Sequence, residues 1–217
     1  MRERVITLAL LMGLFFGVLV LAMGAREWRS PGNQQGYAPE QPIAFSHRLH
    51  AGELSIDCQF CHVAADNSRY AGIPTSDICF KCHKFVTASF AAVMDERKKA
   101  AKEKREPAPV VSAELKKLYD MMGLDDQLKP QDSTGLKPIP WVRIHELPDH
   151  VLFNHQAHVQ AGVACQRCHG PVETFERMYQ YETLSMGWCV NCHREVNRTG
   201  VSGKAVHASI DCAACHY

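Results

Sequence analysis

The chain has 217 residues, with 24 lysines and arginines against 23 aspartates and glutamates, and a formal net charge of +1. This length suits one compact domain, or two small ones, together with a membrane anchor. The near-zero charge argues against nucleic acid as a partner, because phosphate binding needs a strongly basic face. The unusual numbers are 10 cysteines and 12 histidines. Even cysteine counts in exported proteins often mean disulfide bonds, so that interpretation has to be tested first.

The N-terminus carries an apolar run that is long enough to cross a membrane. Residues 5–25 contain no charged side chain. About 20 apolar residues span a bilayer as a helix, whereas the apolar core of a signal peptide usually has roughly 7–15 residues. Small residues near the end of the run keep cleavage as a signal peptide open as an alternative. Arg2 and Arg4 precede the run, so the positive-inside rule places the N-terminus in the cytoplasm.

A change in composition after the apolar run divides the rest of the chain into segments. Residues rich in Pro, Gly and Gln come first, and two segments rich in Cys and His follow with an insertion between them. We therefore predict an anchor over 1–29, a linker over 30–42 and a domain rich in Cys and His over 43–217. Within that domain we predict modules at 43–94 and 151–197, a terminal unit at 207–217 and an insertion at 95–150.

The insertion carries two helix signals and no chemical motif. A charged stretch over residues 95–106 is rich in Ala, Glu and Lys, and Pro107 ends it. Ser112 and Gly123 then bracket a short amphipathic segment, with serine suited to an N-cap and glycine to a C-terminus.

The two segments rich in Cys and His repeat each other. Each opens with Phe-x-His-x-x-His, at Phe45 and at Phe153, and continues with two Cys-x-x-Cys-His motifs. A fifth motif closes the chain. The motif cysteines are Cys58 and Cys61, Cys79 and Cys82, Cys165 and Cys168, Cys189 and Cys192, and Cys212 and Cys215, and the histidines that follow them are His62, His83, His169, His193 and His216. The matching order indicates an internal duplication.

Cys-x-x-Cys-His is the attachment signal for haem c. The two cysteines form thioethers with the haem vinyl groups, and the adjacent histidine binds the iron from one face. Disulfide bonds would explain an even number of cysteines but not a histidine after every pair. Zinc sites combine such pairs with histidine, but not in five identical units, and a thioredoxin-like motif would occur once. The sequence therefore predicts five haem c groups that use all ten cysteines.

The Phe-x-His-x-x-His sequences supply candidates for the second, distal ligand of each iron. Residues three apart lie on one face of a helix, so the two imidazoles of a pair can reach two different haems. These candidates are His47 and His50 in the first module and His155 and His158 in the second.

The fifth haem has no distal ligand supplied by the repeat. His207 and Met186 compete for its iron, with Met94, Met178 and His145 as further candidates. A methionine ligand would raise the potential of that haem relative to a haem with two histidines. His145 also begins a segment that superficially resembles a zinc-protease helix, but its second histidine is one residue too far and a proline interrupts it.

Five large apolar macrocycles would form much of the core of a chain this size. We therefore expect a mainly α fold with extensive loops around a haem core, one N-terminal transmembrane helix, and little or no β-sheet.

These motifs resemble the class III (cytochrome c3/c7-like) multihaem cytochromes, whose mark is Phe-x-His-x-x-His ahead of haem motifs. More narrowly, the chain is similar to the membrane-anchored pentahaem cytochrome c subunit of alternative complex III. The shared features are the single N-terminal span, the two-plus-two-plus-one layout of motifs, the Ser-Met-Gly-Trp-Cys189 segment and the terminal motif at His216.

That resemblance implies an electron-transfer subunit of a respiratory quinol:electron-acceptor oxidoreductase. An iron–sulfur subunit would feed electrons in, and a monohaem cytochrome c or a terminal oxidase would receive them. Quinol would be oxidised in a polytopic membrane subunit, and this chain would not be an enzyme on its own. We expect a single-pass protein of the bacterial inner membrane with its haem domain in the periplasm.

Two other functions stay open from the sequence. One is a stand-alone membrane-anchored multihaem quinol dehydrogenase, which would oxidise quinol without further subunits. The other is a multihaem nitrite or hydroxylamine reductase, which would need a haem with an open face. No motif is altered in a way that marks a catalytic haem.

Overall fold

The computed structural model describes residues 2–27, 33–131 and 137–217. Residues 28–32 lie outside the described residues, and they include the end of the predicted anchor and the start of the predicted linker. Residue 1 and residues 132–136 of the predicted insertion lie outside them as well.

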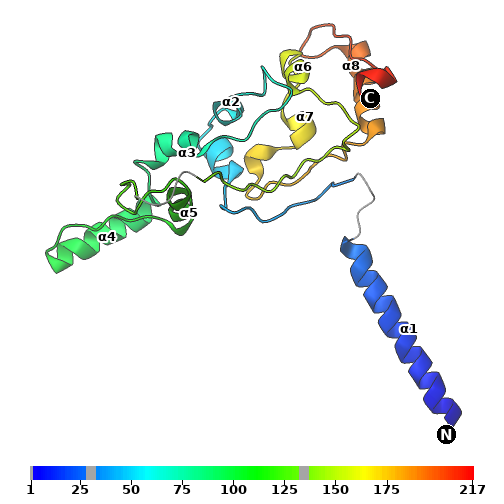
Figure 1. The fold of residues 1–217 in the computed structure, drawn as a ribbon, viewed down its shortest axis with the longest axis horizontal. Coiled ribbons are helices and arrows are strands. Elements are labelled where there is room, and N and C mark those ends of the chain that lie inside the picture. The colour runs from blue at the N-terminus through cyan, green and yellow to red at the C-terminus, as the bar shows by residue number, and fades with distance from the viewer. Residues whose placement is uncertain (1, 28–32, 132–136) are drawn as a thin grey trace.

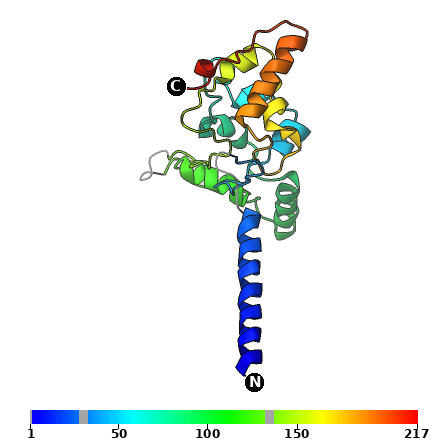
Figure 2. The ribbon, with the colours of Figure 1, turned by 90° about the vertical axis from the view of Figure 1, so that its right-hand side faces the viewer.

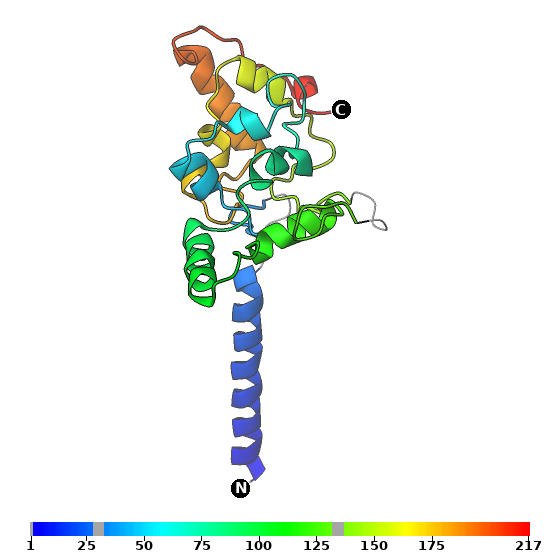
Figure 3. The same ribbon diagram turned by 90° about the vertical axis from the view of Figure 1, so that its left-hand side faces the viewer.

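The N-terminal run forms one long helix, α1 (Arg2–Glu27), which extends away from the other helices in all three ribbon views (Figures 1, 2 and 3). Its segment Arg2–Met23 is long and apolar enough to cross a membrane, and none of it is buried against the rest of the chain. An exposed helix that is apolar on every side is suited to lipid, since its backbone polar groups are bonded within the helix. By length and composition, α1 is therefore a candidate membrane span.

Short helices and loops make up the remainder of the chain (Figure 1). In chain order they are η1 (Arg48–Glu53), α2 (Cys58–Cys61), α3 (Ser76–His83), α4 (Phe90–Glu103), α5 (Ala113–Met121), α6 (His155–Gln160), α7 (Gln166–His169), η2 (Val172–Thr174), α8 (Met186–Thr199) and η3 (Cys212–Ala214). The residues that the structure describes contain only isolated β-bridges and no strand. The predicted mainly α fold with long loops and no sheet is confirmed.

Both helices that the sequence predicts around the insertion form, but α4 starts at Phe90, before the predicted boundary at residue 95. In α4, Ser89 caps the N-terminus by accepting a hydrogen bond from the Ala92 N–H, and Lys104 ends the helix in the left-handed conformation. In α5, the predicted cap Ser112 accepts from the Leu115 N–H. Each cap satisfies one of the free N–H groups at a helix start, which fixes where the helix begins.

The buried core is small and lies where α5 meets the second motif. Ile43, Leu118 and Tyr119 are buried there, with Phe80 and Trp141 packed against them. Elsewhere in the described chain the only other buried side chains are Ala100, Phe175 and Gln180. Chains of this length usually bury many more apolar side chains, so side chains alone form little of the interior around the other motifs.

Candidate functional site

The five Cys-x-x-Cys-His motifs all lie on helices, from a single turn to the 14 residues of α8. Motifs one to five lie on α2, α3, α7, α8 and η3. Asp57 and Asp211 cap α2 and η3 by accepting from the N–H two residues on, and Ser185 caps α8. A helical turn brings residues three apart to the same side, so each pair of cysteines faces one way. None of the ten cysteines forms a disulfide bond.

Four of the five motif histidines are held by backbone carbonyls. The Nδ1 atoms of His62, His83, His193 and His216 bond the carbonyl oxygens of Gly72, Val86, Ser209 and His150, respectively. A ring with its Nδ1–H donated in this way has its bare Nε2 on the other side, which is the tautomer that binds a metal. The fifth, His169, differs: its Nδ1 lies 3.2 Å from Nε2 of His145.

Each Phe-x-His-x-x-His sequence folds into the same arrangement of three rings. In the first module Phe45 is edge-on to His47 at 5.0 Å and stacked on His50 at 4.3 Å between ring centres. In the second module Phe153 is edge-on to His155 at 4.8 Å and stacked on His158 at 4.7 Å. The phenylalanine thus holds the two imidazoles of a pair at a steep angle to each other, and they point toward different neighbours.

The second histidine of each pair faces the second motif histidine of its own module. The ring centres of His50 and His83 are 6.1 Å apart, and those of His158 and His193 are 6.0 Å apart. In all four rings Nδ1 bonds a backbone carbonyl, which leaves Nε2 free. Bonds from metal to imidazole nitrogen are about 2 Å long, so two imidazoles on opposite sides of one ion have ring centres roughly 6 Å apart. The spacing fits an iron between each pair.

The first histidine of each pair lies near the first motif histidine of its module. His155 and His169 have ring centres 6.4 Å apart and planes within 6° of parallel. Burial lowers the pKa of His47 to about 4, and electrostatic repulsion from His62 and His50 adds to this effect. Burial likewise lowers the pKa of His169 to about 3, with His145 and His155 adding to it. Neutral imidazoles are the form that binds metal.

The terminal motif has a different neighbour. The rings of His150 and His216 are stacked at 5.5 Å, and the His150 carbonyl accepts from the His216 ring. Neither His207 nor Met186 makes a ring contact or hydrogen bond with His216 in the described part of the chain, and Met186 is 70% exposed. Sequence reasoning did not predict this contact of His150.

Electrostatic interactions between cysteines of different motifs indicate which motifs are neighbours in space. Burial raises the pKa of Cys61, Cys168 and Cys189, and a cysteine of another motif raises each further: Cys82, Cys192 and Cys215, respectively. The neighbouring Cys165 adds to the effect of burial in raising the pKa of Cys58. The motifs therefore adjoin in the order second, first, third, fourth, fifth, and form one row.

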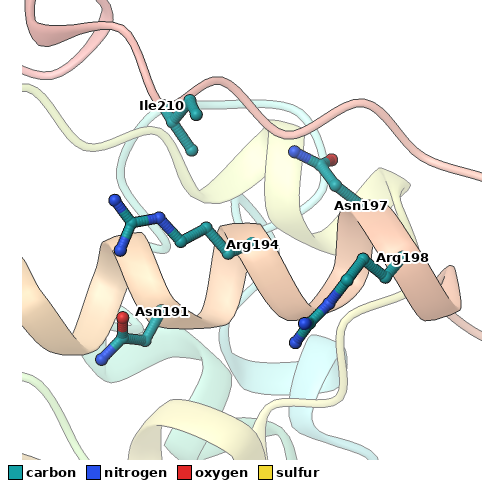
Figure 4. Close-up of a pocket in the computed structure, with 5 residues that line it drawn as sticks. All are labelled: Asn191, Arg194, Asn197, Arg198 and Ile210. Atoms are coloured by element: carbon teal, nitrogen blue, oxygen red, sulfur yellow. The ribbon is translucent and has the colours of Figure 1, made fainter.

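A groove with two arginines adjoins the far end of this row. It lies between α8 and the segment before η3, and Asn191, Arg194, Asn197, Arg198 and Ile210 line it (Figure 4). The Asn197 side chain bonds both the N–H and the carbonyl of Ala208, which fixes the two walls together. Arg194 and Arg198 have no ion-pair partner among the described residues, so this end presents positive charge.

The residues present fit haem c. Paired cysteines with an adjacent histidine would supply thioether and iron ligands, and the facing imidazoles have the spacing that two ligands of one iron would need. Apolar side chains beside the motifs, including Phe60, Ile73 and Ile210, are exposed rather than packed on other side chains. An apolar macrocycle bound at the motifs would cover such side chains.

The fold, the motifs and the geometry of the paired histidines resemble those of multihaem c-type cytochromes, which carry electrons. Residues 151–217 match the family of cytochrome c7 and related cytochromes c. The chain is also 26% identical over 223 residues to the multiheme cytochrome c subunit of menaquinone reductase from Nitratidesulfovibrio vulgaris strain Hildenborough. That similarity covers 93% of this chain and 88% of the relative.

Proposed function

We propose that this chain is the membrane-anchored electron relay of a quinone-linked respiratory complex, with five c-type haems. The row of five motifs carries the proposal. Electrons pass between haems that lie close together, and the row offers one continuous path. The cysteines and motif histidines would hold the haems, and His47, His50, His155 and His158 would supply four distal ligands. His207 and Met186 remain the proposed candidates for the fifth.

The two ends of the row would meet different partners. The second motif lies against α5, where the Tyr119 hydroxyl donates to the His83 carbonyl. The fifth motif lies beside the groove with Arg194 and Arg198, which suits an acidic surface. Two separate contact surfaces are what an intermediate carrier needs, because it has to receive electrons from one protein and deliver them to another.

The finer proposal is a complex of the alternative complex III type. There the chain would take electrons from an iron–sulfur subunit and pass them to a monohaem cytochrome c or a terminal oxidase, while a polytopic subunit oxidises quinol. The anchor would place the haem domain in the periplasm of a bacterial inner membrane, since covalent haem attachment takes place on the exported side. On this proposal the chain is a subunit of an oxidoreductase and has no reaction of its own.

A menaquinone-reducing complex is the second candidate, and the similarity to the menaquinone reductase subunit favours it. In that case electrons would flow toward the quinone pool. The two candidates need the same relay but run it in opposite directions.

Gentle detergent purification followed by mass spectrometry of the co-purifying subunits tests the proposal. We expect an iron–sulfur subunit and at least one polytopic subunit, and the intact mass of the denatured chain should include five haems. The direction follows from two assays on the same complex: reduction of the haems by added quinol, and oxidation of pre-reduced haems by added menaquinone. A chain that purifies alone and oxidises quinol would overturn the proposal in favour of a stand-alone dehydrogenase.

A further inference from the structure

The third motif differs from the other four in what holds its histidine. The Nδ1 atoms of His62, His83, His193 and His216 bond backbone carbonyls, which every substitution leaves in place. His169 instead has a side chain as its partner, Nε2 of His145 at 3.2 Å. This is the one motif whose histidine can lose its hydrogen-bond partner by a single substitution.

The geometry places His145 behind His169 rather than across an iron from it. The two rings are 4.4 Å apart between centres, with planes at 81°. His145 contacts the Nδ1 side, whereas His155 lies 6.4 Å from His169 with its plane nearly parallel. A neutral imidazole has one N–H and one bare nitrogen. His169 can therefore donate Nδ1–H to His145 and keep its own Nε2 for iron.

We propose that His145 is a positioning residue that orients His169 and tunes the potential of the haem at Cys165 to His169. The inference rests on the proposed haem at that motif. Partners of this kind fix the tautomer and orientation of a ligating histidine and raise its basicity. A more basic ligand favours ferric over ferrous iron, so the bond lowers the potential of this haem. The other four proximal histidines have a carbonyl in the same role.

The test compares three variants by spectroelectrochemical titration and electron paramagnetic resonance of the purified complex. His145→Ala removes the acceptor, His145→Phe keeps a ring without an acceptor, and His145→Gln supplies an amide oxygen that accepts. Loss of a partner of this kind typically weakens a metal site about 10-fold to 100-fold. A 10-fold loss of ferric preference corresponds to about 59 mV for a one-electron couple. We expect the reduction potential of one haem to rise by at least that much in the Ala and Phe variants. In His145→Gln the potential of that haem should stay close to its value in the unaltered chain.

Glu146, the exposed residue next to His145, supplies the matched control. Glu146→Gln should leave the reduction potentials of all haems unchanged. Unchanged potentials in both His145→Ala and His145→Phe would overturn the inference. A new high-spin haem in those variants would also overturn it, because it would make His145 an iron ligand. If His145→Ala does not accumulate, the Phe and Gln variants make the same comparison. An intact mass without a haem on the third motif of the unaltered chain would instead overturn the proposed haem itself.

Discussion

The two modules use the same three-ring arrangement but support it differently. Phe45 and Phe153 each stack on the second histidine of their pair at 4.3 and 4.7 Å. In the first module, however, the buried Nδ1 of His47 has no hydrogen-bond partner among the described residues. In the second, Nδ1 of His155 bonds the carbonyl of Arg69, which belongs to the first module. The two modules therefore share the arrangement of the three rings but differ in the hydrogen bonds that support it.

Each module also completes the helix that carries the other module's histidine pair. The first N–H groups of α6, at His155 and Gln156, donate to the carbonyls of Arg69 and Ser68. In return, the Arg48 N–H at the start of η1 donates to the Phe175 carbonyl beside η2. Free N–H groups at helix starts need such partners. Each module therefore helps to fix where the other module's histidine-bearing helix begins.

The largest expected effect comes from removing the matched histidines that face the second motif of each module. His50→Ala and His158→Ala should each leave one of the five haems without its distal ligand. In each variant we expect a single high-spin haem that binds carbon monoxide when reduced, while all five haems stay attached by their cysteines. Optical spectra with and without carbon monoxide check this.

Equal effects in the two variants would support equivalent roles of the two modules in ligation. A fully low-spin spectrum in either variant would contradict the pairing of that histidine with its motif. His207→Ala and Met186→Ala, measured in the same way, distinguish the two candidates for the fifth iron.

A smaller effect, on folding stability, is expected where η1 of the first module packs against η2 of the second. An ideal Cβ on Gly52 in η1 would lie 2.3 Å from the Glu173 carbonyl oxygen in η2. Because the obstacle is backbone, Gly52→Ala has to separate the two elements, and overpacking of this kind costs about 1–3 kcal/mol. Thermal unfolding of the haem-loaded protein should show the loss. An unchanged melting temperature would mean that the modules are not tightly joined at this point.

The sequence predicted the parts of this molecule that depend on local pattern. The apolar N-terminal helix, a helix in the charged stretch before Pro107, the helix starting after Ser112 and the mainly α fold follow from composition, one cap and the bulk of the expected haems. The relation between motifs could not be predicted in this way. That Cys58 adjoins Cys165, or that His145 contacts His169, depends on how loops separated by many residues close, and no periodicity encodes that. The sequence named His145 only as a further candidate for the fifth iron and did not predict its contact with His169, because an isolated histidine has no pattern.

The stacking of phenylalanine on histidine gives a more finely matched comparison. Phe45→Leu and Phe153→Leu keep an apolar side chain but remove the aromatic contact with His50 and His158. Aromatic pairs contribute about 0.5–1.5 kcal/mol beyond the area that they bury. We expect both variants to lose stability by this amount and to keep low-spin haems. If only one variant loses stability, the hydrogen bonds that differ between the two modules, and not the ring contact alone, determine how much the phenylalanine contributes.

The smallest expected effect lies in the insertion that separates the modules. The Arg105 guanidinium, bonded to Glu96 at 2.6 Å, and the Ala108 N–H lower the pKa of Glu96 to about 2 from an ordinary 4.5. A carboxylate whose pKa is depressed by folding stabilises the folded state above its unfolded pKa, and this contribution is lost as pH falls from 4.5 toward 2. Acid should therefore loosen the segment that follows α4.

Glu96→Gln removes this titration but keeps a hydrogen-bond acceptor. The helix content of the variant and of the unaltered chain is compared by circular dichroism between pH 5 and pH 3. This range lies around and below the ordinary pKa of 4.5 and above the lowered one of about 2. Other carboxylates, such as Glu114 and Glu176, also have lowered pKa values, so only the difference between the two proteins reports on Glu96. We expect the unaltered chain to lose slightly more helix over this range than the variant. The haem spectra should stay the same in both, because Glu96 and Arg105 contact no motif. A change in the haem spectrum that occurs in the unaltered chain but not in Glu96→Gln would mean that the insertion stabilises the haem-bearing modules.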